Sequence, residues 1–186
     1  MKIGVFGGTF DPVHTGHMIS AVEARKTLKL DKVIFIPAFQ SPHKGEPGSD
    51  TNRLQMLESA VESYPFFEID TFELKNKGLS YTYDTVKYLT NKYAGDELYF
   101  LIGTDQYDNF EKWYRYQSLL EMIHFAVMRR HDSNAVILEP FIDVGQPVIE
   151  ISSTDIRHRI KKQDEYRHLL PESVYGYIKE NNLYET

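Results

Sequence analysis

The sequence contains no cysteine among its 186 residues. This absence excludes disulfide bonds and thiolate metal sites, and it agrees with a reducing, cytoplasmic location. No apolar stretch approaches the ~20 residues that a membrane-spanning helix needs. Residues 1–5 also lack the long apolar stretch of a secretory signal peptide. We therefore expect a cytoplasmic protein without a membrane partner.

The chain also lacks an excess of basic residues. Its 21 Lys and Arg are outnumbered by 27 Asp and Glu, which gives a formal net charge of −6. The one basic cluster, at residues 157–162, is flanked by Asp155, Asp164 and Glu165. A nucleic-acid-binding protein would usually carry a basic stripe, so we expect no nucleic-acid partner. An acidic chain can still bind a small polyanion where a few cations are gathered.

Repeats and low-complexity tracts are missing as well. Only residues 40–49, with the sequence QSPHKGEPGS, are rich in Gly, Pro and Ser, and they are predicted to form an exposed loop. The hydrophobic content of 41% and the charged content of 26% are those of a globular protein. The length suits a single domain over residues 1–186.

Short apolar runs alternate with helical periods along the chain. Continuous apolar runs at residues 2–7 and 32–37 predict strands buried on both faces. A more alternating run at residues 67–74 predicts a strand nearer a sheet edge. The remaining strands are predicted at residues 97–103, 124–128 and 148–151.

Apolar residues at helical spacing predict a helix after most of these strands. The predicted helices cover residues 18–28, 54–64, 86–93 and 110–120, and a last one opens at Pro171. This alternation predicts an α/β fold: a Rossmann-like, doubly wound parallel sheet followed by a C-terminal helical segment. Ligands of such sheets bind at the carboxyl ends of strands, where the strand order reverses.

The segment GGTFDPVHTGH, residues 7–17, lies where the first strand turns into the first helix. Gly7 and Gly8 allow the backbone to approach a ligand closely. The free amides and the dipole at a helix start favour phosphate. His14 and His17 can lie on one side of the first turn, where imidazoles can donate to phosphate or become cationic beside it. The segment therefore predicts a phosphate site.

Other interpretations of this segment are weaker. Two histidines are too few for a zinc site. The segment is neither Gly-x-Gly-x-x-Gly nor followed by Gly-Lys-Ser/Thr, which disfavours a nicotinamide oxidoreductase and a P-loop. A tight turn with two incidental histidines remains as the structural alternative.

The same segment resembles the N-terminal signature of the nucleotidyltransferase superfamily, Gly-x-Phe-x-Pro-x-His-x-Gly-His. Near the other end, ISSTDIR at residues 151–157 resembles the superfamily's Ser-x-Thr-x-x-Arg motif, although Ser152 with Asp155 also fits a simple helix cap. The resemblance implies a nucleotidyltransferase-type fold. It also implies that ATP is bound by nine residues: Gly7, Gly8, Thr9, Phe10, His14, His17, Ser152, Thr154 and Arg157.

Four segments between these motifs resemble the bacterial nicotinate mononucleotide adenylyltransferase family. They are SPHK at 41–44, SYTYDT at 80–85, IGTDQ at 102–106, and the segment around Trp113. The resemblance implies that Lys44 acts with His14, His17 and Arg157 in catalysis. It also assigns the second nucleotide to six positions: Thr82, Thr85, Gly103, Asp105, Trp113 and Tyr114.

In that family the nicotinate ring stacks on the tryptophan, which here is Trp113. The carboxylate of the nicotinate ring takes hydrogen bonds at the positions of Thr82 and Tyr114. Taken alone, these residues have plainer explanations. Trp113 has the helical spacing of a core residue, Lys44 reads as a solvated cation, and Asp105 could cap a helix. Arg53 is predicted equally as a phosphate contact or as an exposed helix cation.

The implied reaction joins ATP and nicotinate mononucleotide into the deamido dinucleotide of NAD biosynthesis and releases pyrophosphate. We expect Mg²⁺ to arrive on ATP, without a dedicated protein ligand. A homo-oligomer is compatible with the sequence. The alternatives are a nicotinamide-preferring enzyme, a pantetheine-phosphate adenylyltransferase, a cytidylyltransferase and a non-catalytic nucleotide-binding regulator.

Overall fold

The computed structural model describes residues 1–39, 48–79, 81–130, 135–148 and 151–185. The strands in these ranges are β1 (Lys2–Gly8), β2 (Lys32–Pro37), β3 (Phe67–Ile69), β4 (Glu97–Gly103), β5 (His124–Arg130) and β6 (Ile142–Val148). The helices are α1 (Thr15–Leu28), α2 (Asp50–Val61), α3 (Phe72–Asn76), α4 (Thr82–Lys92), α5 (Thr104–Asp108), α6 (Tyr116–Met122), α7 (Ser153–Lys162) and α8 (Glu172–Glu180). Two 3₁₀ turns, η1 (Phe110–Lys112) and η2 (Arg167–Leu169), complete the elements.

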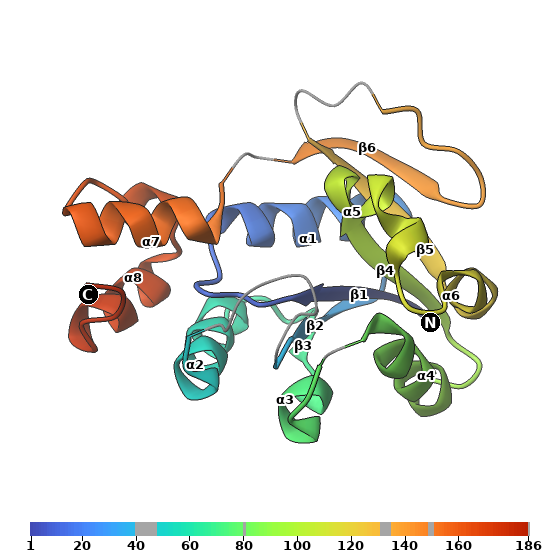
Figure 1. Cartoon of the computed structure of the whole chain (residues 1–186), viewed down its shortest axis with the longest axis horizontal. Coiled ribbons are helices and arrows are strands. Elements are labelled where there is room, and N and C mark those ends of the chain that lie inside the picture. The colour runs from blue at the N-terminus through green and yellow to red at the C-terminus, as the bar shows by residue number, and fades with distance from the viewer. Residues whose placement is uncertain (40–47, 80, 131–134, 149–150, 186) are drawn as a thin grey trace.

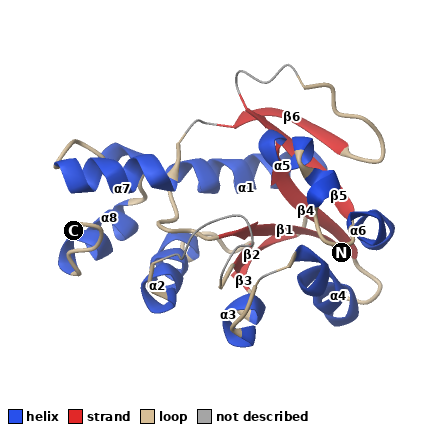
Figure 2. Cartoon of the chain, viewed as in Figure 1, coloured by secondary structure: helices blue, strands red, loops and turns tan. Residues whose placement is uncertain are grey.

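The strands form one sheet in the order β3-β2-β1-β4-β5-β6, and every neighbouring pair is parallel. Figure 2 shows the strands gathered between helices, with β6 at one edge. The chain runs outward from β1 to β3 and then returns to the other side of β1 with β4. The strand order therefore reverses between β1 and β4, which is where ligands bind in such sheets. The predicted α/β fold class is confirmed.

Buried apolar side chains cover both faces of the sheet. Successive strand residues alternate between two clusters: Phe6 and Leu101 belong to one, Val5 and Ile102 to the other. Since neighbouring side chains of a strand point to opposite faces, the clusters lie on opposite sides. Helices α1, α2, α7 and α8 contribute to the first cluster, and α4 and α6 to the second. Figure 1 shows α1 above the sheet and α4 below it.

The strand predicted over residues 67–74 is half right. It begins at Phe67 and forms an edge strand, as expected, but it ends at Ile69 and is followed by α3. The carboxylate of Asp70 accepts a hydrogen bond from the Phe72 amide at 2.9 Å. This local side-chain turn stops the strand, and the alternating apolar residues that follow belong to a helix.

The strand predicted at residues 148–151 has the wrong bounds: β6 covers Ile142–Val148, Ile151 is irregular, and residues 149–150 lie outside the described residues. The sequence of β6, IDVGQPV, contains a glycine and a proline and reads as a loop. Both are tolerated because β6 is an edge strand, and its pairing with β5 has an irregularity between Val127 and Arg129.

The helix predicted over residues 110–120 is interrupted. Turn η1 ends at Lys112, Trp113 is extended, and α6 starts only at Tyr116. Arg115, just before α6, has a left-handed backbone with φ of 55°. Trp113 therefore lies on a connection and not on a helix. None of the helices in the described ranges has the length and apolar character to cross a bilayer.

Candidate active site

The signature turn, residues 7–17, lies at the carboxyl end of β1 and leads into α1. His14 is the N-cap of α1, and its Nδ1 accepts a hydrogen bond from the His17 amide at 3.3 Å. The Nδ1 atom of His17 accepts one from the His14 amide at 3.2 Å. The two rings stack with centroids 3.6 Å apart. The two histidines thus form a reciprocal capping box, a task usually performed by Ser/Thr and Glu.

This capping arrangement decides which ring nitrogens can donate. Each Nδ1 is an acceptor, so a neutral ring of either residue carries its proton on Nε2. His14 is 5% exposed, and burial lowers its pKa to about 4. Near neutral pH the free protein therefore offers an uncharged N–H at His14. A bound polyanion would raise that pKa and favour the cation.

Two glycines are required by the rings in this turn. A Cβ on Gly8 would lie 3.0 Å from the ring of Phe10, and a Cβ on Gly16 would lie 3.1 Å from His14 Nδ1. Any side chain there would displace the aromatic or the imidazole. Close packing of the rings thus explains both glycines.

Phe10 holds the middle of the turn. It has a left-handed backbone with φ of 49°, which is uncommon for a residue with a bulky side chain. Its ring is buried and contacts Phe6 and His17 edge-on, with centroids 5.8 Å and 5.1 Å away. The surroundings therefore impose the conformation of the Gly8–Asp11 backbone.

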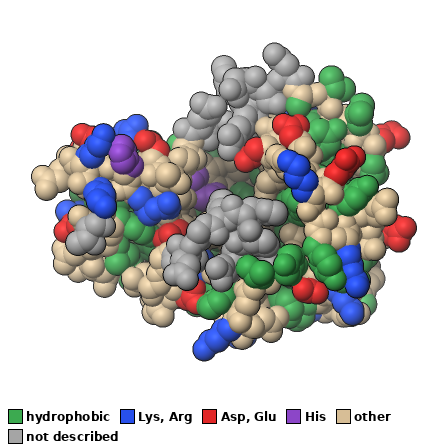
Figure 3. Space-filling view, viewed as in Figure 1, with side chains coloured by type: hydrophobic (Ala, Val, Ile, Leu, Met, Phe, Trp, Pro, Cys, Tyr) green, Lys and Arg blue, Asp and Glu red, His purple; other side chains and the backbone are tan. Residues whose placement is uncertain are grey.

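The N-terminus of α7 lies beside the signature turn (Figure 1). Ser153 Oγ donates to the Pro12 carbonyl at 2.9 Å, and Arg157 Nη1 donates to the Asp11 carbonyl at 2.6 Å. Ser152 caps the helix by accepting from the Asp155 amide at 3.0 Å. Two helix N-termini therefore converge next to β1. Figure 3 shows several Lys and Arg side chains over α7, with Asp and Glu side chains among them, next to a hollow in this face.

The Ser-Thr-Arg segment is partly used within the protein. Ser152 serves as the helix cap considered above, yet its hydroxyl hydrogen is not committed by accepting that bond. Thr154 is exposed, and its Oγ1 accepts from Arg157 Nη2 at 3.4 Å. Arg157 is partly exposed, and its Nη1 lies 4.0 Å from an Asp11 carboxylate oxygen. Each residue keeps an exposed polar group at the start of α7.

A second cluster joins the start of α4 to the connection before α6. We call Tyr81, Tyr83, Tyr114 and Arg115 the aromatic patch. The Tyr114 ring lies 5.2 Å from Tyr81 and 5.9 Å from Tyr83. The Arg115 guanidinium lies 4.8 Å from the Tyr83 centroid. Thr82 lies between Tyr81 and Tyr83 in the sequence, at the start of α4.

Trp113 is half-buried beside this patch. Its ring lies 5.1 Å from Phe110 and 6.3 Å from Phe125, and it packs against the second core cluster. The core-packing explanation thus accounts for part of the ring. The rest is exposed, and Tyr114, the next residue, is 48% exposed.

The other predicted substrate residues differ in their surroundings. Gly103 ends β4 and caps α5, and Asp105 is exposed in the first turn of that helix, so both lie at the switch point. Thr85 is buried, and its hydroxyl bonds to the Glu73 carboxylate at 2.5 Å, which ties α4 to α3. The Thr85 hydroxyl is therefore already engaged. Lys44 and the rest of the SPHK segment, with Ser80, lie outside the described residues.

Arg53 is neither the phosphate contact nor the exposed helix cation that the sequence predicts. Its side chain is 0% exposed and donates to the carbonyls of Thr9, Ala38 and Gly48 and to Asp50. It is a buried link between segments, because every one of these acceptors belongs to the protein.

Sequence reasoning missed two further contacts of the signature turn. Asp11 is buried, and its carboxylate accepts from the Tyr184 hydroxyl at 2.6 Å and the Gly48 amide at 2.9 Å. Burial, and then this carboxylate, raise the pKa of Tyr184 well above its usual value. The local sequence pattern contains no signal for a contact between two residues that are 173 positions apart. Arg115 could have been suspected only as a cation next to an aromatic pair.

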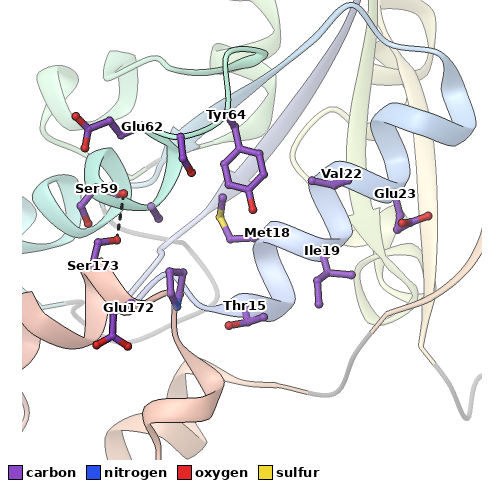
Figure 4. A pocket seen from close by; sticks show the side chains of 13 residues that line it. Thr15, Met18, Ile19, Val22, Glu23, Ser59, Glu62, Tyr64, Glu172 and Ser173 are labelled. Carbon is purple, nitrogen blue, oxygen red and sulfur yellow. Dashed lines mark hydrogen bonds between the residues drawn. The ribbon is translucent and has the colours of Figure 1, made fainter.

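No group of three or more His, Asp or Glu in the described ranges is arranged to hold a metal ion. A cavity of about 730 Å³ lies between α1, α2 and α8, lined by Met18, Ile19, Val22 and Tyr64 among others. Figure 4 shows these side chains around it. It shares Thr15 with the start of α1 but contains neither histidine. The two histidines predicted to bind phosphate therefore lie outside this cavity.

Comparisons with known proteins agree with the geometry. A family model described as cytidylyltransferase-like matches residues 5–159. The nicotinate-nucleotide adenylyltransferase of Bacillus subtilis (strain 168) is 40% identical over 187 residues, covering 100% of this chain and 99% of the relative. A protein of Oceanobacillus iheyensis named probable nicotinate-nucleotide adenylyltransferase is 41% identical over 184 residues, covering 98% of this chain and 96% of the relative.

Solved structures show the same fold at lower identity. The Plasmodium falciparum nicotinic acid mononucleotide adenylyltransferase complexed with NaAD has a TM-score of 0.81 at 19% identity, covering 99% of this chain and 97% of that one. The same enzyme complexed with APC has a TM-score of 0.79 at 18% identity, with the same coverage. The chain therefore belongs to the cytidylyltransferase-like family and, within it, to the nicotinate-nucleotide adenylyltransferases.

Proposed function

We propose that the chain joins ATP and nicotinate mononucleotide into nicotinate adenine dinucleotide and releases pyrophosphate, a step of NAD biosynthesis. The proposal rests mainly on one observation: the start of α7 packs on the signature turn through Ser153 and Arg157, next to the stacked histidines at the start of α1. Helix starts and cations together favour a polyphosphate. The names of the full-length relatives supply the second substrate.

The bond changes need little from the protein beyond alignment and charge. A phosphate oxygen of the mononucleotide forms a bond to the α-phosphorus of ATP, and the bond from that phosphorus to the β-phosphate bridge oxygen breaks. Pyrophosphate leaves with the bonding electron pair. The attacking phosphate is already ionised near neutral pH, so no strong general base is required. Catalysis consists of holding both groups in line and stabilising the charge.

His14 and His17 would bind the phosphates through their Nε2 atoms. The capping box fixes both rings by their Nδ1 atoms, so the proton of each neutral ring is on Nε2. A donor fixed before the substrate arrives costs no reorganisation when charge develops on the phosphoryl oxygens.

Arg157, Ser152 and Thr154 would bind the phosphates from the α7 side. The guanidinium is anchored by the Asp11 carbonyl, which connects its position to the signature turn. The exposed hydroxyls at the α7 start add neutral donors. The amides from Gly7 to Phe10 would complete the phosphate site, and Lys44 is proposed to act with them. We propose that the signature turn, the start of α7 and the segment of Lys44 belong to a single domain over residues 1–186.

The aromatic patch would bind the mononucleotide. The exposed part of Trp113 offers a face for a pyridinium ring, which stacking and a cation–π term both favour. Thr82 and Tyr114 would donate to the ring carboxylate. The Arg115 guanidinium, above Tyr83 and Tyr114, favours a carboxylate over a neutral amide. We therefore propose a preference for nicotinate over nicotinamide mononucleotide.

Magnesium belongs with the substrate in this proposal. Mg²⁺ usually keeps waters and substrate phosphates among its ligands and needs few carboxylates from the protein. Bound to ATP, the ion would neutralise charge on the phosphates and orient pyrophosphate for departure.

One assay tests the proposed function. Purified protein receives MgATP with nicotinate mononucleotide, nicotinamide mononucleotide or phosphopantetheine, and pyrophosphate release is followed. We expect fast release with the first substrate, slower release with the second and none with the third. Release only with phosphopantetheine, or none with any of them, would contradict the proposal.

A further inference from the structure

Arg53 is a buried cation that has no role in the proposed reaction as described so far. It lies in the first turn of α2, and its side chain is 0% exposed. Its one carboxylate partner in the described structure is Asp50, which is partly exposed. Burying a guanidinium is costly unless its N–H groups all find acceptors. The acceptors that Arg53 finds are therefore informative.

Three of these acceptors are backbone carbonyls from three separate segments. Nη1 donates to Thr9 and to Ala38, both at 2.7 Å, and Nε donates to Gly48 at 3.1 Å. Thr9 belongs to the signature turn, Ala38 follows β2, and Gly48 precedes α2. A planar fork of fixed donors can satisfy all three, whereas a single ammonium group cannot reach them together. Arg53 thus joins the signature turn to two neighbouring segments.

The contact with Thr9 also sets the direction of an amide. In a trans peptide the C=O and the following N–H point in opposite directions. Because Arg53 holds the Thr9 carbonyl, the Phe10 N–H is turned away from α2. That N–H donates to no acceptor within the described structure. The left-handed φ of 49° at Phe10 shows that this peptide is held against its local preference.

We propose that Arg53 is a positioning residue for nucleotidyl transfer. It fixes the Thr9–Phe10 peptide so that the Phe10 N–H is presented to a phosphate oxygen of ATP. The inference rests on the proposed function, because the amide has a task only if the signature turn binds phosphate. Arg53 itself touches no substrate, since its side chain is buried and its donors face protein acceptors.

Two substitutions at Arg53 and one control test this role. Arg53→Met keeps the bulk and removes every donor, and Arg53→Lys keeps the charge but can serve fewer carbonyls. Tyr177→Phe is the matched control: it removes the 3.0 Å hydrogen bond between Tyr177 and Asn52, the neighbour of Arg53 on α2, without touching the signature turn. Circular dichroism and thermal unfolding establish that each variant folds. Activity is measured well below each melting temperature.

We expect Arg53→Lys to raise the Kd for MgATP, measured by calorimetry without the second substrate, about tenfold, and to lower kcat as well. Arg53→Met should raise the Kd for MgATP and lower kcat by larger factors. The Kd for adenosine, which has no phosphate, should stay within about twofold, and Tyr177→Phe should leave both affinities unchanged. A folded Arg53→Lys protein with wild-type MgATP affinity and kcat would overturn the proposal, as would equal losses for MgATP and adenosine. Because calorimetry needs no turnover, failure of the proposed reaction would be seen separately, as a wild-type protein that binds MgATP but makes no product.

Discussion

The signature turn and the aromatic patch differ in how tightly the protein holds them. In the signature turn, His14 and Phe10 are buried, and backbone hydrogen bonds fix both imidazoles. In the patch, Tyr114 is half-exposed, and the contacts are ring against ring or cation over ring. A rigid set of donors suits the phosphate chemistry that the family shares. A looser, more exposed set suits discrimination between mononucleotides, which the bond-making step does not require.

The largest effect is expected from removing a fixed donor of the signature turn. His17→Ala should lower kcat about a hundredfold to a thousandfold, the range seen when one preorganised donor is lost. Pyrophosphate release at saturating substrates measures it. His17→Asn is the matched variant, because its side-chain oxygen can replace Nδ1 in the cap while nothing replaces Nε2. If the Asn variant kept wild-type turnover, His17 would be only a helix cap.

The buried imidazole of the signature turn should also be visible in stability. His14 has a folded pKa of about 4, below its ordinary 6.5. The unfolded chain therefore binds a proton at a higher pH than the folded protein does. The contribution of neutral His14 to the free energy of unfolding should be fully present above pH 6.5. The free energy of unfolding should fall by up to about 3 kcal/mol as the pH drops towards 4.

Denaturant unfolding at several pH values between 4 and 7 measures this loss. His14→Asn keeps a good N-cap and does not titrate, so its stability should vary less over the same window. An Asn variant that loses as much stability as the wild type would assign the pH dependence to other groups.

A smaller effect is expected in the aromatic patch. Trp113→Ala should raise KM for nicotinate mononucleotide about tenfold to a hundredfold, because stacking on an aromatic ring is lost. KM for ATP should change little, which would separate the two regions of the site. Trp113→Phe should recover part of the affinity. A Trp113→Ala protein that loses stability but keeps KM would restore the core-packing explanation.

The smallest effect is expected from the exposed cation. Arg115→Gln should reduce the ratio of kcat/KM for nicotinate over nicotinamide mononucleotide about twofold to fivefold, as for other exposed charge interactions. The effect should shrink at high salt, since exposed charges are screened. An unchanged ratio at low salt would leave discrimination to Thr82 and Tyr114.

The sequence predicted the parts of the molecule whose causes are local. The buried strands, the glycine-histidine turn and the α7 cap follow from residues close together in the chain. The edge strand β6 was missed because Gly145 and Pro147 indicate a loop, and they are tolerated in this strand because it lies at the edge of the sheet. The break at Arg115 was missed because helical spacing carries no information about a left-handed residue.

The supports of the site could not be predicted for a related reason. Arg53 reads as a surface cation in its own helix, and only folding brings Thr9 and Ala38 to it. The contact between Asp11 and Tyr184 joins opposite ends of the chain. Motifs therefore revealed the groups that face a ligand, whereas the groups that hold them were visible only in the folded structure.

A crystal structure with a non-hydrolysable ATP analogue and Mg²⁺ tests the central claim most directly. The account predicts the triphosphate between the starts of α1 and α7, with Nε2 of His14 and His17 and the Phe10 amide within about 3 Å of phosphate oxygens. A triphosphate bound elsewhere, for instance in the cavity between α1, α2 and α8, would contradict it.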